Sequence, residues 1–457
     1  MTTTKLPVLL WIHGGGFEAG AGQSFAGETT LAPGVFYQGA NLVRRSQDMG
    51  QPIIVASINY RLNHFGFSAS QEMADAGLLN LGLEDQRNAM KWIQQNIEAF
   101  GGDATKVTIM GESAGSWSVT AHLVANDGDH EDLFRAAVGI SGGPLKVTDH
   151  QGRSQELFNS LVEFVDCASA TNKIACLRLA PYEKIYEHAQ GVNFLLGYRS
   201  LASAWTLRPD GHFLTKSPDI LVSEGKIANV PLMYGDVADE GTLFSLVNSL
   251  NTTTTEEVKD YFKTYWWPDI TEEQLDRLME LYPTPDEDTT LVQGLVKPGP
   301  QFRRISDITG DYSFQSQRRQ LLAATTAPRY NYLIEQSVPL PLLPALPLVA
   351  SIIDKTSLTD IPILGSFHAS DVILNWFGTL PETVSKNTYH LMGVLVAFVN
   401  QGNPNGHGMK DVPTWPQYEE EGKQTMLWKE SGVGVVKDEW REEGMEFLNE
   451  IGDVLRI

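Results

Sequence analysis

Short, uninterrupted apolar runs recur along the first third of the chain and alternate with segments of mixed polarity. The runs are Leu6–Ile12, 52–60, 107–110 and 136–141. Continuous apolar runs of this length are typical of parallel strands that are covered on both faces of a sheet. Between the second and third runs, the apolar residues of 83–100 repeat at helical spacing, and Gly101-Gly102 ends the pattern. This alternation predicts an α/β fold with a mostly parallel central sheet and helices on both faces.

Beyond residue 145 the pattern becomes irregular and mainly helical. Strand character returns at 230–235 and at 330–334. The segment 338–353 is apolar but carries four prolines, so we expect neither a regular helix nor a membrane span there. We predict a single domain over residues 1–457. The segments in which we expect cap elements or insertions over the active site are 145–330 and 338–362.

Composition narrows the classes of partner. The 457 residues carry a formal net charge of −22, which disfavours nucleic acid and anionic membrane surfaces. No apolar run approaches the roughly 18 residues of a transmembrane helix. The two cysteines, Cys167 and Cys176, are close enough in sequence for a local disulfide, and two reduced thiols are the alternative. No pair of cysteines or histidines near them has zinc-ligand spacing, so we expect no metal and no cofactor.

Two glycine-rich motifs follow predicted strands. Residues 111–115 read Gly-Glu-Ser-Ala-Gly between a predicted strand and a predicted helix, a context in which this motif predicts a nucleophile, Ser113, on a sharp turn. Both glycines are expected because a Cβ at either position would clash in so tight a turn. The second motif, residues 13–17, places three glycines directly after Leu6–Ile12. A bare backbone at that point favours an oxyanion hole over a flexible linker.

A serine nucleophile requires a histidine base and a carboxylate that orients the histidine. In this type of fold the chain order is serine, acid, histidine. The histidines late enough for this order are His368, His390 and His407. We favour His368, because a strand-like run there meets a polar turn and then an amphipathic helix. The acid candidates that the residues leave nearly equal are Asp236, Asp239 and Glu240.

Six motifs occur in an order that resembles the type-B carboxylesterase/lipase family, which includes the cholinesterases. The motifs are WIHGGGF, the segment 86–103, GESAGS, the segment 213–235, DEGTLF and SFHASD. The resemblance covers nearly the whole chain and is nearest to the fungal lipases and sterol esterases of the family. It implies an α/β-hydrolase fold, Glu240 as the acid and His368 as the base. The oxyanion-hole donors that it implies are the amides of Gly15, Gly16 and Ala114.

The same resemblance implies a Cys167–Cys176 disulfide and a secreted glycoprotein. The one glycosylation sequon begins at Asn251 and is weak support for export. No signal-peptide pattern precedes Leu6–Ile12. Family members carry a long segment before WIHGGGF, so the chain resembles a member truncated at its N-terminus. We therefore expect the strands that complete the sheet beside Leu6–Ile12 to lie upstream of Met1.

These observations predict a serine carboxylic-ester hydrolase with a Ser-His-Glu triad and an acyl-enzyme intermediate. The substrates that we expect are small-molecule or lipid esters, mainly lipophilic ones, including esters at a lipid interface. The alternative is an inactive fragment or a non-catalytic cholinesterase-like interaction protein. All three triad positions are filled in this sequence, which favours the hydrolase. The sequence does not determine the alcohol group, the acyl-chain length or the oligomeric state.

Overall fold

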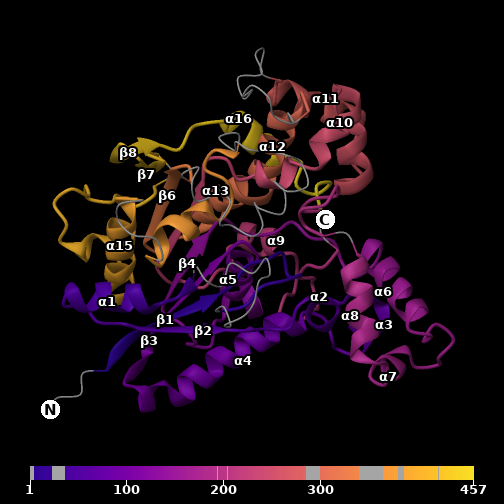
Figure 1. Cartoon of the computed structure of the whole chain (residues 1–457), viewed down its shortest axis with the longest axis horizontal. Coiled ribbons are helices and arrows are strands. Elements are labelled where there is room, and N and C mark those ends of the chain that lie inside the picture. The colour runs from indigo at the N-terminus through magenta and orange to yellow at the C-terminus, as the bar shows by residue number, and fades with distance from the viewer. Residues whose placement is uncertain are drawn as a thin grey trace.

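A single eight-stranded sheet forms the centre of the part of the chain that the structure describes. The computed structural model describes residues 5–22, 37–192, 194–202, 204–284, 299–338, 364–378, 385–419 and 421–457. The strands are β1 (Leu6–Ile12), β2 (Ile54–Ile58), β3 (Gly102–Glu112), β4 (Ala136–Ile140), β5 (Leu232–Val237), β6 (Arg329–Glu335), β7 (Gln424–Lys429) and β8 (Gly432–Lys437). Their order is β2-β1-β3-β4-β5-β6-β7-β8 (Figure 1). Neighbouring strands are parallel except β7 and β8, which confirms the predicted α/β fold.

Helices connect the strands. The described α-helices are α1 (Ala40–Asp48), α2 (Asn63–Phe67), α3 (Gln71–Asp75), α4 (Leu81–Asn96), α5 (Ala114–Val124), α6 (Arg153–Phe164), α7 (Lys173–Leu177), α8 (Tyr182–Gly191), α9 (Pro218–Ser223), α10 (Thr255–Tyr261), α11 (Glu272–Leu281), α12 (Phe302–Gly310), α13 (Ser316–Ala324), α15 (Asn387–Gln401) and α16 (Glu442–Glu450). The short 3-10 segments are η2 (Ile97–Phe100), η3 (Ala125–Gly128), η4 (Leu243–Ser245), η5 (Asn248–Leu250) and η11 (Pro404–His407). The π-helical turns are η6 (Phe262–Trp266), η7 (Asp311–Gln315) and η10 (Val372–Trp376). The helix predicted at 83–100 corresponds to α4 and η2.

Alternate residues of β1 enter two separate cores, one on each face of the sheet. Val8, Leu10 and Ile12 pack with residues of α4 and α5. Leu9 and Trp11 pack with residues of α1 and α15 on the opposite face. All five side chains are fully buried. Burial on both faces explains why β1 is a continuous apolar run and not an alternating one.

Among the described residues, one edge of the sheet lies at β2. β1 pairs with β2 on one side and with β3 on the other. In the part of the chain that the structure describes, β2 has a strand partner on one side only, so the expectation that strands upstream of Met1 complete this side of the sheet stays a prediction. We also expected residues 52–60 to be covered on both faces. The residues of β2 are instead half-buried or exposed, because only one strand pairs with this edge strand.

Two groups of helices stand beside the sheet (Figure 1). In one group, α8 packs on α2 and α6, and α7 packs on α3. In the other, α11 packs on α16 and is joined to α10 by an ion pair between Asp276 and Lys259. The Cys167–Cys176 disulfide links the residues after α6 to α7, with Cα atoms 5.7 Å apart, which confirms the bridge implied by the resemblance. The predicted cap segment 338–362, with the proline-rich run at 338–353, lies outside the described residues apart from Val338.

Candidate active site

Ser113 lies on the turn between β3 and α5, at the carboxyl end of a central strand. Its φ of +57° and ψ of −125° are a backbone conformation that side chains rarely adopt. A Cβ at Gly111 would lie 2.3 Å from the Gly115 carbonyl oxygen, and a Cβ at Gly115 would lie 2.1 Å from the Ile12 oxygen. Both glycines are therefore required by packing, and the turn has the geometry of a nucleophile elbow.

The glycine loop after β1 lies directly beside the elbow. A Cβ at Gly14 would lie 2.8 Å from Ser113 Cβ, and the φ values of Gly15 and Gly16 are +109° and +63°. The N–H groups of Gly15 and Gly16 have no acceptor among the described residues. Ala114 begins α5, so its N–H has no partner within the helix. These three amides are available to donate hydrogen bonds to a substrate oxygen.

The structure brings Glu240 and His368 together from distant parts of the chain. Glu240 Oε2 lies 2.6 Å from His368 Nδ1, and Glu240 Oε1 accepts the Val237 N–H at 2.9 Å. Both side chains are buried. When the imidazole is neutral, a carboxylate at Nδ1 favours the tautomer with the proton on that nitrogen, which leaves Nε2 able to accept a proton. This is the contact by which the acid of a catalytic triad orients its histidine.

A second carboxylate faces the other nitrogen of His368. Glu112 Oε1 lies 3.1 Å from His368 Nε2, and the Glu112 side chain is buried. The Ser113 hydroxyl makes no hydrogen bond to any residue that the structure describes, and catalytic hydrogen bonds often shorten only when substrate is bound. Sequence reasoning did not single out Glu112, although its place directly before Ser113 in the elbow motif was a signal.

These two carboxylates determine the protonation of His368. Burial alone would lower the pKa of His368, but Glu240 and Glu112 raise that pKa well above the usual value of a histidine. Only the unprotonated imidazole can accept a proton from a hydroxyl. A reaction that uses His368 as a base should therefore be lost as the pH falls through this raised pKa.

Substitution of Glu112 tests this dependence on pH. Glu112→Gln removes one negative charge beside His368 and should move the acid limb of kcat/KM for ester hydrolysis to lower pH by about one unit. The control is Asp371→Asn, which removes a nearby carboxylate that does not contact His368. The Asp371 carboxylate instead accepts the Val372 N–H and the Trp376 Nε1–H, each at 2.9 Å. Superimposable pH profiles for Glu112→Gln and the wild type would contradict this account of the charge at His368.

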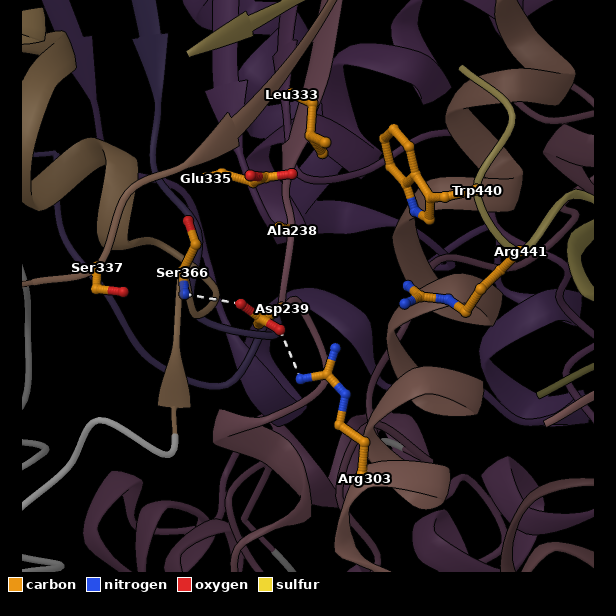
Figure 2. A pocket seen from close by; sticks show the side chains of 9 residues that line it. All are labelled: Ala238, Asp239, Arg303, Leu333, Glu335, Ser337, Ser366, Trp440 and Arg441. Atoms are coloured by element: carbon orange, nitrogen blue, oxygen red, sulfur yellow. Dashed lines mark hydrogen bonds and ion pairs between the residues drawn. The ribbon is translucent and has the colours of Figure 1, made fainter. Parts of the chain in front are cut away.

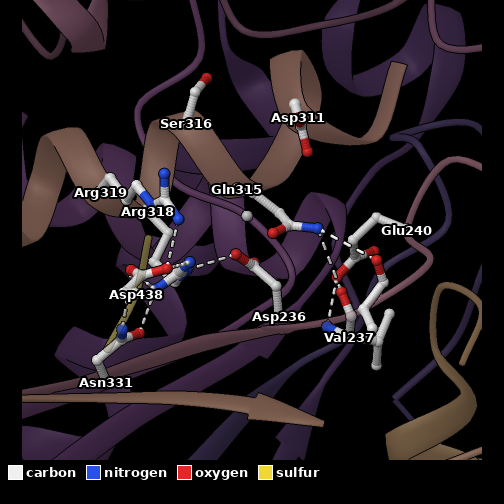
Figure 3. A network of polar contacts seen from close by, with 12 residues as sticks. Asp236, Val237, Glu240, Asp311, Gln315, Ser316, Arg318, Arg319, Asn331 and Asp438 are labelled. Carbon is white, nitrogen blue, oxygen red and sulfur yellow. Dashed lines mark hydrogen bonds and ion pairs between the residues drawn. The ribbon is translucent and has the colours of Figure 1, made fainter. Parts of the chain in front are cut away.

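The other two acid candidates point elsewhere. Asp236 Oδ2 accepts the Nε–H of Arg318 at 2.6 Å, and its carboxylate is directed at Arg318 and not at Glu240 (Figure 3). Burial raises the pKa of Asp236 to about 7, although Arg318 opposes this shift. Asp239 forms an ion pair with Arg303 on α12. Of the three carboxylates that the sequence left nearly equal, Glu240 is the one that contacts His368.

Aromatic side chains surround His368. Its ring centroid lies 4.5 Å from that of Phe314 and 4.9 Å from that of Phe244. Phe314 in turn stacks on Trp117, with centroids 5.7 Å apart. An apolar, water-poor surrounding strengthens the electrostatic contacts at His368 and favours apolar groups beside it.

The remaining features considered from the sequence are the glycosylation sequon, metal sites and membrane spans. Asn251 is exposed directly after η5, and Thr253 Oγ1, at the end of the sequon, donates to Glu257 at 2.9 Å. Within the described ranges, no group of three or more His, Cys, Asp or Glu side chains is arranged to hold a metal ion. No helix in the same ranges is both long enough and apolar enough to cross a membrane.

Comparison with known proteins decides the family. A family model described as "Carboxylesterase family" matches residues 1–448. The chain belongs to the carboxylesterase family. Lipase 2 of Diutina rugosa is 36% identical to this carboxylesterase over 455 residues, which cover 97% of the chain and 75% of the relative. The secreted triacylglycerol lipase LIP1 of Gibberella zeae is 36% identical over 461 residues, which cover 97% and 71%.

Solved structures agree with this assignment at the level of the fold. The crystal structure of Aspergillus niger EstA superposes with a TM-score of 0.78 at 24% identity and covers 99% of this carboxylesterase and 82% of EstA. A PNB esterase superposes with a TM-score of 0.73 at 22% identity, covering 98% and 82%. The family predicted from the motifs is confirmed, and with it the prediction that the protein is an ester hydrolase.

Proposed function

We propose that this carboxylesterase hydrolyses esters through an acyl-enzyme on Ser113, with His368 as the base and Glu240 as the acid that orients it. The observation that carries the proposal is the contact of Glu240 with His368 Nδ1 at 2.6 Å. This contact occurs beside a serine whose backbone has the strained geometry of a nucleophile elbow.

In the first step, His368 Nε2 accepts the Ser113 proton while Ser113 Oγ attacks the ester carbonyl carbon. The carbon–oxygen bond to the alcohol then breaks, and His368 donates the proton to the departing alcohol oxygen. In the second step, water loses a proton to His368 and attacks the acyl-enzyme. The carboxylic acid is released as the proton returns to Ser113 Oγ.

The amides of Gly15, Gly16 and Ala114 act as the oxyanion hole in both steps. The carbonyl oxygen gains negative charge when the tetrahedral intermediate forms. Donors already fixed in place stabilise this charge without reorganising, and each such donor contributes about 10²–10³ in kcat in well-studied enzymes. The positive end of the α5 dipole, directly after Ser113, acts in the same direction.

The substrates that we propose are lipophilic esters, including esters presented at a lipid interface. Support comes from Phe244, Phe314 and Trp117, buried aromatic residues that make the surroundings of His368 apolar. Two relatives are named as a lipase and a triacylglycerol lipase.

A series of p-nitrophenyl esters tests both the reaction and the substrate class. We expect kcat/KM to rise from acetate through butyrate to octanoate, because each added methylene that is buried contributes about 0.8 kcal/mol. Release of p-nitrophenolate is followed by absorbance and corrected for the uncatalysed rate. Absence of hydrolysis with every ester would contradict the proposed reaction. A preference for acetate over octanoate would contradict the proposed substrate class.

The location, modification and domain organisation are also proposals. Two relatives are named as secreted lipases, and on that ground we propose that the protein is exported and that Asn251 carries a glycan. We propose that residues 1–457 form one α/β-hydrolase domain with cap elements in 145–330 and 338–362. In the first of these ranges, β5 belongs to the sheet and α6, α7 and α8 lie beside it.

A further inference from the structure

We infer that Asp239 is a positioning residue that ties the loop carrying Glu240 to the loop carrying His368, and that Arg303 holds Asp239 in place. The inference rests on the proposed function, because it concerns the geometry of the same pair. It assigns to Asp239 a role different from that of the triad acid, for which the sequence alone left it a candidate.

Asp239 makes two hydrogen bonds to one residue of the histidine loop. Its backbone N–H donates to the Ser366 carbonyl oxygen at 3.0 Å, and its Oδ2 accepts the Ser366 N–H at 2.9 Å. An isolated parallel β-bridge also joins Asp239 to Phe367, the next residue of this loop. Glu240 directly follows Asp239, and His368 lies two residues after Ser366. These bonds therefore fix the distance across which Glu240 reaches His368.

Two neighbouring residues fit this arrangement closely. Gly365 has a φ of +59°, and a Cβ there would lie 2.2 Å from Asp239 Oδ2, so the carboxylate rests against bare backbone. Thr242 Oγ1 lies 2.8 Å from the Asp239 carbonyl oxygen and 2.7 Å from the Leu364 carbonyl oxygen. The loop that carries Glu240 therefore contacts the loop that carries His368 at two places, through Asp239 and through Thr242.

Arg303 on α12 holds the remaining oxygen of Asp239. Its Nη1 lies 2.6 Å from Asp239 Oδ1, and its Nη2 lies 3.1 Å from Asp307 Oδ1 on the same helix. The Asp239 side chain is only 19% exposed, so this ion pair is partly shielded from solvent. Because both oxygens of Asp239 are occupied, its carboxylate can neither rotate away from Ser366 nor replace Glu240 at His368.

A cavity of about 460 Å³ opens beside the ion pair. Figure 2 shows Arg303 and Asp239 at its wall, with Trp440 and Leu333 also facing the cavity. A small cation in solution can therefore reach Asp239 when the Arg303 side chain is removed. The cavity makes the ion pair testable by chemical rescue.

We expect Arg303→Ala to lower kcat by about 10- to 100-fold, as a small misplacement of a catalytic group does, with little change in KM. Millimolar guanidinium chloride should restore part of the lost kcat by binding Asp239 in the vacated space. Sodium chloride at the same ionic strength should restore none. Asp239→Ala should show a similar loss without rescue, and its acid limb of kcat/KM should move to lower pH as Glu240 shifts away from His368.

Arg277→Ala is the matched control, because Arg277 is half-exposed and pairs with Glu280 on α11. Rates are expressed per site titrated by an organophosphonate, which separates misfolded protein from slow enzyme. A wild-type kcat per titrated site in both Asp239→Ala and Arg303→Ala would overturn the inference. A loss in Arg303→Ala that guanidinium leaves unchanged would overturn the role of Arg303. Absence of hydrolysis by the wild type would instead refute the proposed function.

Discussion

Ser113→Ala should lower kcat for p-nitrophenyl butyrate by about 10⁶-fold, to the level of residual binding and oxyanion stabilisation. The hydroxyl of Ser113 sits on the elbow beside the free amides of Gly15 and Gly16. Single-turnover and steady-state rates of the purified variant measure the loss.

Ser116→Ala is the control for this substitution. Ser116 lies on the same helix and is buried, and its Oγ donates to the Gly142 carbonyl oxygen at 3.0 Å. We expect its kcat to stay close to that of the wild type, and both variants to unfold at similar temperatures. Turnover of Ser113→Ala within about 100-fold of the wild type would show that another group carries the acyl chain.

Glu240→Gln should lower kcat by about 10³- to 10⁴-fold while leaving KM nearly unchanged. The amide retains the shape of the carboxylate but offers no charge to the imidazolium that forms during attack, and its NH₂ group favours the wrong tautomer of His368. Steady-state kinetics on a short ester, at a pH above the acid limb of each enzyme, measure the effect.

The carboxylates near Glu240 provide the controls. Asp236→Asn, Asp239→Asn and Asp371→Asn should each cost less than Glu240→Gln, because none of the three contacts His368. Asp371 is the most informative of them, since it lies three residues after His368 and is fully buried. A larger loss in Asp371→Asn than in Glu240→Gln would move the role of triad acid away from Glu240.

The strands that were predictable from the sequence are those with an apolar run, including β2, although β2 is only half-buried. β1, β3, β4, β5 and β6 each appear as an apolar run, because helices cover both sides of the parallel sheet. β7 and β8 were not predicted. β8 alternates glycine with half-exposed valines, and such a weak apolar signal does not separate an edge hairpin from a loop.

The site was predictable only where chemistry and local sequence coincide. The elbow at Ser113 and the glycine loop are contiguous motifs, so their geometry follows from short-range steric requirements. The pairing of Glu240 with His368 joins positions 128 residues apart. The residues favoured His368 but left three acids nearly equal, and the family resemblance was needed to select Glu240. The Glu112–His368 contact and the tie between Asp239 and Ser366 depend on side-chain directions at the ends of different strands, which spacing along the chain does not encode.

The most direct measurement of the central claim is the site at which the enzyme is covalently labelled. Reaction of the wild type with a p-nitrophenyl phosphonate, followed by proteolysis and mass spectrometry, should place one phosphonyl group on Ser113. Hydrolytic activity should be lost in proportion to this labelling. The account predicts no label in Ser113→Ala under the same conditions. Stoichiometric labelling of a different serine, with activity lost in parallel, would contradict it.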